Sequence, residues 1–284
     1  MSTNNSLVSL DLKSVSKVGI VLIEKVSAAI GGLYKPYQVV QMAKAQVKAE
    51  IIEAEGQIKV EELKHRALDR FISEEIKKQA NIESITGKAI PLLENTADAE
   101  QLEDDWVSNF FDKCRITSDS DMQQLWAKVL AGEVNSPGKF SKRTINLLSD
   151  LDKSDAELFQ TFCGFCWMIG TITPLIFEVT SDVYSKNGIN FNRIMHLESL
   201  GLVQYSGAIS RFMRSGLPDK FIISYYGQPL SLKKLPEAGN EFTTGQVNLT
   251  NAGMQLAEIC GSKPVQGFFD YVVDYYKQNH YSPT

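Results

Sequence analysis

The chain has 284 residues, of which 43 % are apolar and 22 % charged, so it is long enough for one large or two modest domains with buried cores. Its formal net charge of -5 argues against a protein that coats nucleic acid over its whole surface. The four cysteines, Cys114, Cys163, Cys166 and Cys260, do not make an extracellular disulfide framework, so we expect reduced thiols in a cytoplasmic protein.

Residues 14–34 are predicted to form an amphipathic helix that follows a polar N-terminus without the pattern of a signal peptide. Its apolar residues recur at spacings of three and four, and a second apolar set broadens the stripe: Val15, Val18, Leu22, Val26, Ala29 and Leu33, then Ile20, Val21, Ile23 and Ile30. Gly31, Gly32 and Pro36 weaken and end the helix.

Three interpretations of this helix remain open. It packs in the protein's own core or in an oligomer, it spans a membrane alone, or it lies on a membrane and inserts as an oligomer. A lone span is disfavoured, because Glu24 and Lys25 each cost roughly 2.5–3.5 kcal/mol at a bilayer centre. In the third interpretation, lipid or neighbouring subunits meet the apolar stripe and close contact uses the glycines: Val18, Leu22, Val26, Ile30, Gly31 and Gly32.

A long charged helix is predicted from Tyr37 to about Ala80, because this stretch has no proline and one glycine, Gly56. Such a helix would be on the order of 65 Å long. A seam for another helix runs along it and continues after a shift of phase at Gly56: Val40, Ala43, Val47, Ile51, Ala54 and Ile58, then Val60, Leu63, Ala67 and Phe71. We therefore expect an arm that pairs with another helix.

The segment from about residue 96 to 170 reads as a bundle of short helices. Ser118 or Ser120 can cap one helix, Ser141 begins another, and Ser154 begins a third that continues to about Ile169. The predicted organisation is an N-terminal segment 1–36, a helical arm 37–95, this bundle 96–170, and a C-terminal domain 171–284.

The C-terminal domain shows a helix at 191–200, strands at 202–205 and 221–226, a helix at 251–259 capped by Thr250, and a last helix at 268–276. The order of helix, strands and helix over roughly 175–260 resembles the winged-helix module of bacterial regulators. Bound to DNA, such a module would use Arg193 in its recognition helix and Arg211, Arg214 and Lys220 in the following loop. The expected fold class is mainly α: long N-terminal helices, a helical bundle and a winged-helix-like α+β domain.

No constellation of residues predicts an enzyme. Cys163 and Cys166 have the spacing of a metal or redox pair but lack a second pair, so buried thiols are expected. The three histidines are scattered, and Glu133 is a carboxylate without a catalytic partner. No phosphate-binding glycine loop is present. We therefore expect neither a cofactor nor a metal.

Several stretches carry a resemblance to known families: IGGLYKPYQVVQMAKAQVKAE, NIESITGKAIPLL, and DDWVSNFFDKCRITSDSDMQQLWAKVLAGEVNSPGKFSKRT with its continuation to Phe159. Together they resemble a bacterial family, the domain of unknown function 2806, which brings no catalytic residues. The N-terminal GGLYKP followed by a long helix is also similar to abortive-infection proteins of the alpha type.

The second resemblance implies an anti-phage effector. Subunits would oligomerise on a trigger, such as a phage protein assembly, and disrupt the inner membrane through the N-terminal helix. Its expected partners are further copies of itself and membrane lipid, with DNA the less favoured partner. The protein would be cytoplasmic, with conditional association to the inner membrane. The alternatives are a cytosolic winged-helix DNA-binding regulator and a structural adaptor in a larger complex.

Overall fold

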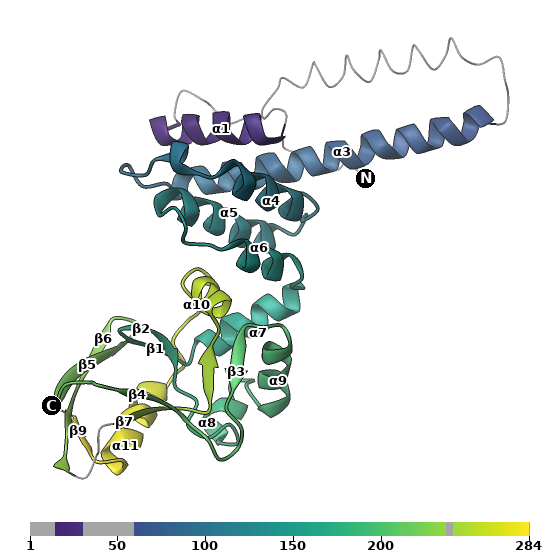
Figure 1. Cartoon of the computed structure of the whole chain (residues 1–284). Helices are drawn as coiled ribbons and strands as arrows, with labels where there is room; N and C mark the ends of the chain where they lie inside the picture. The colour runs from purple at the N-terminus through teal and green to yellow at the C-terminus, as the bar shows by residue number, and fades with distance from the viewer. Residues whose placement is uncertain (1–14, 31–59, 237–240, 284) are drawn as a thin grey trace. The chain divides into compact units, whose positions relative to one another are not determined.

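The computed structural model describes residues 15–30, 60–236 and 241–283. The chain divides into two compact units, Met1–Ile145 and Asn146–Thr284, and each is described by itself below (Figure 1).

Unit 1 is helical. Its elements are α1 (Lys17–Ile30), α3 (Val60–Ala89), the 3-10 turns η2 (Ile90–Leu92) and η3 (Ala99–Gln101), α4 (Asp104–Cys114) and α5 (Ser120–Asn135). The helix α6 (Lys142–Ser149) crosses the boundary between the units. The core of unit 1 is an aromatic cluster in which Phe110 lies 5.1 Å from Trp106 and 5.3 Å from Trp126, measured between ring centroids. The stripe of aromatic residues on α4 thus packs against α5.

A buried carboxylate orders the loop after α5. Glu133 is 5 % exposed, and its two carboxylate oxygens accept hydrogen bonds from the backbone N–H groups of Gly138 and Phe140, at 2.6 and 2.7 Å. The carbonyl of Phe140 in turn accepts a 2.6 Å hydrogen bond from the Trp106 indole. Glu133 therefore has a structural role, since it satisfies two backbone donors, of which the Phe140 N–H is buried.

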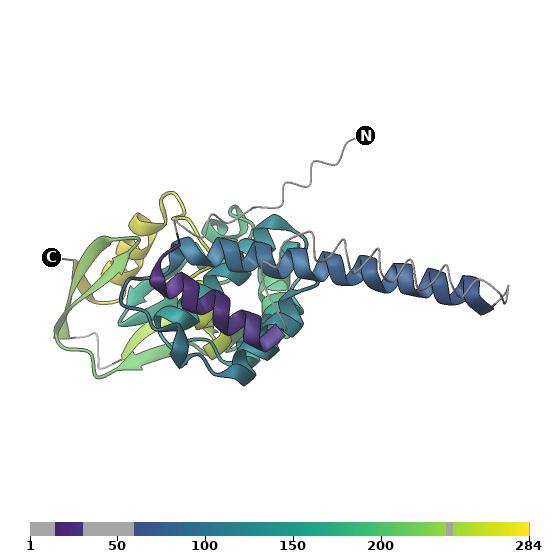
Figure 2. The same ribbon diagram turned by 90° about the horizontal axis from the view of Figure 1, so that it is seen from above.

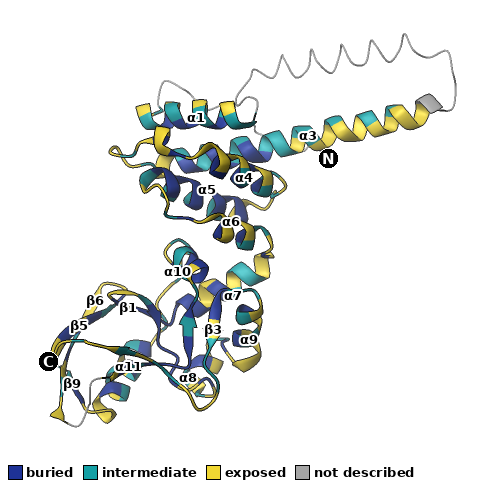
Figure 3. Ribbon diagram, in the orientation of Figure 1, coloured by how far each residue is buried: buried dark blue, intermediate teal, exposed yellow. Residues whose placement is uncertain are grey.

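The two halves of α3 differ in their surroundings. Ile82, Ile85 and Ala89 in its second half are buried, and this half packs on α5. The first half projects beyond the other described helices of unit 1 and is mostly exposed (Figures 2 and 3).

Unit 2 combines short helices with antiparallel sheets. The helices are α7 (Lys153–Cys163), α8 (Asp182–Ser185), α9 (Phe191–Ser199), α10 (Asn251–Ala257) and α11 (Phe268–Gln278). The strands are β1 (Cys166–Ile169), β2 (Thr171–Pro174), β3 (Val203–Tyr205), β4 (Phe212–Ser215), β5 (Lys220–Tyr225), β6 (Gln228–Lys234), β7 (Glu241–Gly245), β8 (Val247–Leu249) and β9 (Tyr281–Pro283). They form a five-stranded sheet in the order β2-β1-β5-β6-β9 and two pairs, β3-β8 and β4-β7.

The core of unit 2 gathers aromatic side chains around α11. Phe268 lies 4.9 Å from Phe165, and Tyr276 lies 4.5 Å from Phe242, measured between ring centroids. The terminal helix is thereby tied both to the start of the large sheet and to β7. Because α11 packs on residues that lie far from it in the sequence, it is an integral part of the fold of unit 2.

The predicted fold class is wrong. About 54 % of the described residues are helical and 16 % are in strands, the helices are mostly short, and three small antiparallel sheets make the protein an α+β mixture. In the C-terminal domain, β3 does not pair with the next strand but with β8, and the strands between them belong to the other two sheets. The expected helix from Ser154 to Ile169 ends at Cys163, and β1 takes its remainder.

Candidate functional site

The predicted amphipathic helix is α1, and its apolar face is turned into unit 1. Leu22 and Val26 are 0 % exposed, and α1 packs on η3 and α4. Gly19 permits a close approach, since a Cβ there would lie 3.3 Å from the Ile90 side chain of η2. The helix is therefore docked by a small apolar patch. Val18 and Ile30 are half-buried, while Gly31 and Gly32 lie outside the described residues.

One charged side chain adds a polar anchor to this docking. Lys25 donates to the carbonyl oxygen of Glu100 at 3.3 Å, and its ammonium nitrogen lies 3.2 Å from a carboxylate oxygen of Asp104. Asp104 begins α4 and its side chain is 83 % exposed. Since exposed ion pairs contribute little, about 0–1 kcal/mol, burial of Leu22 and Val26 dominates the docking of α1.

The four basic residues named for nucleic-acid contact lie in unit 2, and three of them bind groups of their own unit. Arg193 donates to the carbonyl oxygen of Gly188 at 2.6 Å. Arg211 pairs with Glu178 at 3.2 Å. Arg214 donates to the carbonyl oxygen of Ile169 and to the hydroxyls of Thr171 and Thr173. The fourth, Lys220, is exposed at the start of β5.

These contacts give the arginines structural roles. Burial lowers the pKa of the Arg214 guanidinium, which fastens the β1–β2 hairpin to β4. A guanidinium held by three acceptors of its own unit has few donors left for phosphate.

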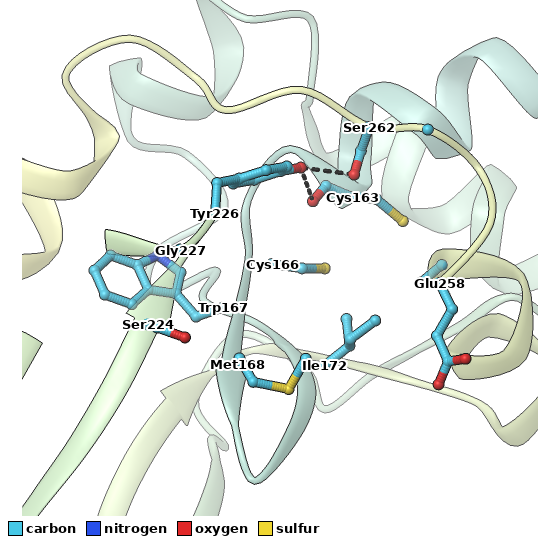
Figure 4. A pocket seen from close by; sticks show the side chains of 12 residues that line it. Cys163, Cys166, Trp167, Met168, Ile172, Ser224, Tyr226, Gly227, Glu258 and Ser262 are labelled. Atoms are coloured by element: carbon cyan, nitrogen blue, oxygen red, sulfur yellow. Dashed lines mark hydrogen bonds between the residues drawn. The ribbon is translucent and has the colours of Figure 1, made fainter. Parts of the chain in front are cut away.

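Unit 2 contains a cavity of about 370 Å³ that the sequence did not predict (Figure 4). It lies among β1, β2, the β5–β6 turn and the segment that follows α10. Its lining residues are Cys163, Cys166, Trp167, Met168, Ile172, Ser224, Tyr226, Gly227, Ala257, Glu258, Gly261 and Ser262. The lining has one carboxylate and no cationic side chain, so its chemistry suits a neutral or cationic small molecule better than a phosphate.

Tyr226 forms one wall of the cavity. Its hydroxyl contacts the Ser262 hydroxyl at 2.6 Å and the carbonyl oxygen of Cys163 at 3.2 Å, as Figure 4 shows. Burial raises the pKa of the Tyr226 phenol well above its ordinary value. The phenol therefore stays protonated near neutral pH and fixes the wall instead of acting as a base.

The Cys163 thiol beside the cavity is a poor nucleophile. Burial raises the pKa of the Cys163 thiol well above its ordinary value, and hydrogen bonds with Cys166 and Cys260 raise it further. Since the thiolate is the nucleophile and the metal ligand, a protonated Cys163 suits a packing role. Within the described ranges, no group of three or more His, Cys, Asp or Glu side chains is arranged to hold a metal ion.

The region of the chain with a family relationship includes both the projecting helix and the cavity. The model of the family described as "Protein of unknown function (DUF2806)" matches residues 65–273. The chain belongs to this family. The DUF2806 match contains most of α3 and every residue that lines the cavity, whereas α1 precedes it. Comparisons with curated proteins and with solved structures gave no match.

The helices that the structure describes include none long and apolar enough to cross a membrane.

Proposed function

We propose that the protein is an effector of bacterial phage defence that disrupts the inner membrane through α1 after its subunits gather on a trigger. The setting in phage defence rests on the resemblance of the N-terminal segment to abortive-infection proteins. The observation that carries the membrane step is the docking of α1, an amphipathic helix whose apolar residues Leu22 and Val26 are stored on unit 1.

Burial of this apolar face keeps α1 docked on unit 1, and the docked form is the proposed resting state. Burying a leucine or valine side chain stabilises the docked form by about 1.5–3 kcal/mol, so two such side chains contribute several kcal/mol. The anchor between Lys25 and Asp104 adds less, because Asp104 is largely exposed. A docking energy of this size keeps α1 on unit 1 in a dispersed subunit and can be offset by a competing apolar surface.

A membrane offers such a competing apolar surface, and gathering of subunits would strengthen the binding of α1 to it. The 14 residues of α1 make a helix of about 21 Å, which is shorter than the roughly 30 Å hydrocarbon core of a bilayer. One released helix therefore binds a membrane weakly. Linked copies gain affinity through their effective concentration and can turn Glu24 and Lys25 toward one another within the bilayer.

The test is dye release from anionic liposomes by the full chain, with and without a bivalent antibody that gathers subunits through a C-terminal tag. Asp104→Lys places two cations together at the anchor and should weaken the docking of α1 by about 1 kcal/mol, so leakage should rise a few-fold above that of the wild type. Asp105→Lys is the matched control, because Asp105 lies in the same first turn of α4 and its carboxylate lies 3.9 Å from Lys142 instead of α1.

Leakage that rises with gathering, and rises further with Asp104→Lys but not with Asp105→Lys, supports the proposal. Equal leakage for the two variants would show that loosening α1 is not the step that matters. A gathered wild-type protein that leaves liposomes intact, with its circular dichroism unchanged, would overturn the membrane function.

A further inference from the structure

The projecting half of α3 carries large apolar side chains that the rest of the described chain leaves uncovered. Leu63 is 64 % exposed and Phe71 is 59 % exposed. Leu68, Ile72 and Ile76 lie on the same half of the helix and are half-buried. A stripe of this kind on a charged helix is the usual signature of a helix-pairing surface.

The stripe consists of two rows with a spacing of four residues. One row is Leu63, Ala67 and Phe71, and the other is Leu68, Ile72 and Ile76. When a second copy of the helix runs antiparallel, with both helices centred between residues 69 and 70, each row of one copy lies opposite the other row of the second copy. In an antiparallel pair centred there, Leu63 lies at the height of Ile76, Ala67 at the height of Ile72, and Leu68 at the height of Phe71 of the other copy. The apolar pattern is thus self-complementary, as an isologous interface requires.

The charges between the two rows agree with this register. Each residue of an α-helix is rotated by about 100° from the one before it, and this rotation places Lys64 and Glu75 between the two apolar rows. In the same antiparallel pair, Lys64 of one copy lies at the height of Glu75 of the other copy, so each lysine would meet a glutamate. A parallel pair in register would instead place lysine against lysine and glutamate against glutamate within the seam, which is unfavourable.

We propose that residues 62–78 of α3 bind the same residues of a second copy of this chain as an antiparallel helix pair, with the twofold axis passing between Asp69 and Arg70. The paired stretch is about 24 Å long. Phe71 and Leu68 of both copies form its centre, and the two Lys64–Glu75 pairs flank that centre. This dimer concerns a different element from α1 and stands whether or not the protein acts on membranes.

The experiment is sedimentation equilibrium of the full chain over a wide concentration range. The wild type should reach the mass of a dimer. Phe71→Glu should shift it to a monomer, because it brings two carboxylates together at the twofold axis. Ser73→Glu is the matched control: Ser73 is exposed on the opposite side of the same helix and gains the same charge, so its variant should remain dimeric.

The register is tested by exchange of charges. Lys64→Glu and Glu75→Lys should each raise the dimer dissociation constant by at least about tenfold, and the double variant should recover affinity near that of the wild type. Recovery is expected only for the antiparallel alignment, since a parallel pair would leave like charges opposed in both the wild type and the double variant.

A wild-type monomer at every concentration would overturn the proposal. If that monomer also lost thermal stability with Phe71→Glu but not with Ser73→Glu, the stripe would belong to another segment of the same chain. A dimer unaffected by Phe71→Glu, or one whose charge variants do not recover in combination, would likewise refute this pairing.

Discussion

The hydroxyl of Tyr225 joins distant parts of unit 2. It donates to the carbonyl oxygen of Gly164 at 2.6 Å and accepts from the backbone N–H of Val265 at 2.6 Å. The residue is 4 % exposed, and burial raises its pKa from 10.0 to about 12. A protonated phenol is thus part of the folded structure.

This shift predicts a loss of stability in alkali. An unfolded chain releases the Tyr225 proton near pH 10, whereas the folded chain keeps it until about pH 12. The folded state therefore binds more protons in this window, and the free energy of unfolding falls as the pH rises through it, by about 2–3 kcal/mol for this group. Below pH 10 the contribution is fully present.

Urea unfolding at a series of pH values measures the effect. Tyr225→Phe should show a shallower fall between pH 10 and pH 12 than the wild type. The fall should not vanish, because burial also raises the pKa of the phenols of Tyr184, Tyr226 and Tyr276. Identical slopes for the two proteins would contradict the assignment to Tyr225.

Tyr226 shows why the cavity could not be predicted from the sequence. It begins the two-residue turn between β5 and β6 with φ of 47°, a conformation that suits glycine or asparagine better than tyrosine. The strand pattern that ends in Tyr225 and Tyr226 can be read from the sequence, but the contacts with Cys163 and Ser262 depend on residues far away in the chain. Only folding brings this wall together.

At the scale of elements, local signals predicted several helices and strands correctly. The Thr250 hydroxyl accepts from the backbone N–H of Gly253 and begins α10, as expected from its capping character. The predicted helix at 268–276 corresponds to α11, and the predicted strand at 221–226 corresponds to β5. The apolar stretch around Gly164 gave no clear period, so its change from α7 to β1 was missed.

The docking of α1 gives a prediction at this scale. Leu22→Ala removes a fully buried side chain and should weaken docking by about 2–4 kcal/mol, whereas Ile20→Ala, at a position 41 % exposed, should cost less than about 1 kcal/mol. Hydrogen exchange of the full chain should show faster exchange in α1 for Leu22→Ala alone. Unchanged protection in that variant would mean that Leu22 does not hold the helix.

At the scale of the whole molecule, the error in fold class came from strand pairing. Strands such as β3 and β8 have three residues each, and their pairing joins Val203 to Leu249 and Tyr205 to Val247. Such short strands carry little periodicity, and nothing local indicates a partner so far along the chain. The prediction therefore overestimated the helical content and included too few of the strands that form the sheets of unit 2.

The division into two units predicts two unfolding transitions, because each unit has its own core around Phe110 or around Phe268. Glu133→Gln replaces one carboxylate oxygen by an amide NH2, which would face one of the two backbone N–H groups as donor against donor, and should cost about 2–3 kcal/mol. It should lower one transition by roughly 10 °C. Tyr225→Phe should lower only the other.

Differential scanning calorimetry of the full chain resolves these outcomes. Glu103→Gln is the control, because Glu103 is an exposed carboxylate of unit 1 whose side chain caps no helix, and it should leave both transitions in place. A single transition that both core variants shift equally would show that the chain unfolds as one cooperative body. Separate shifts would mean that the docking of α1 and the cavity of unit 2 are maintained by independent cores, so a variant in one unit can be interpreted without correction for the other.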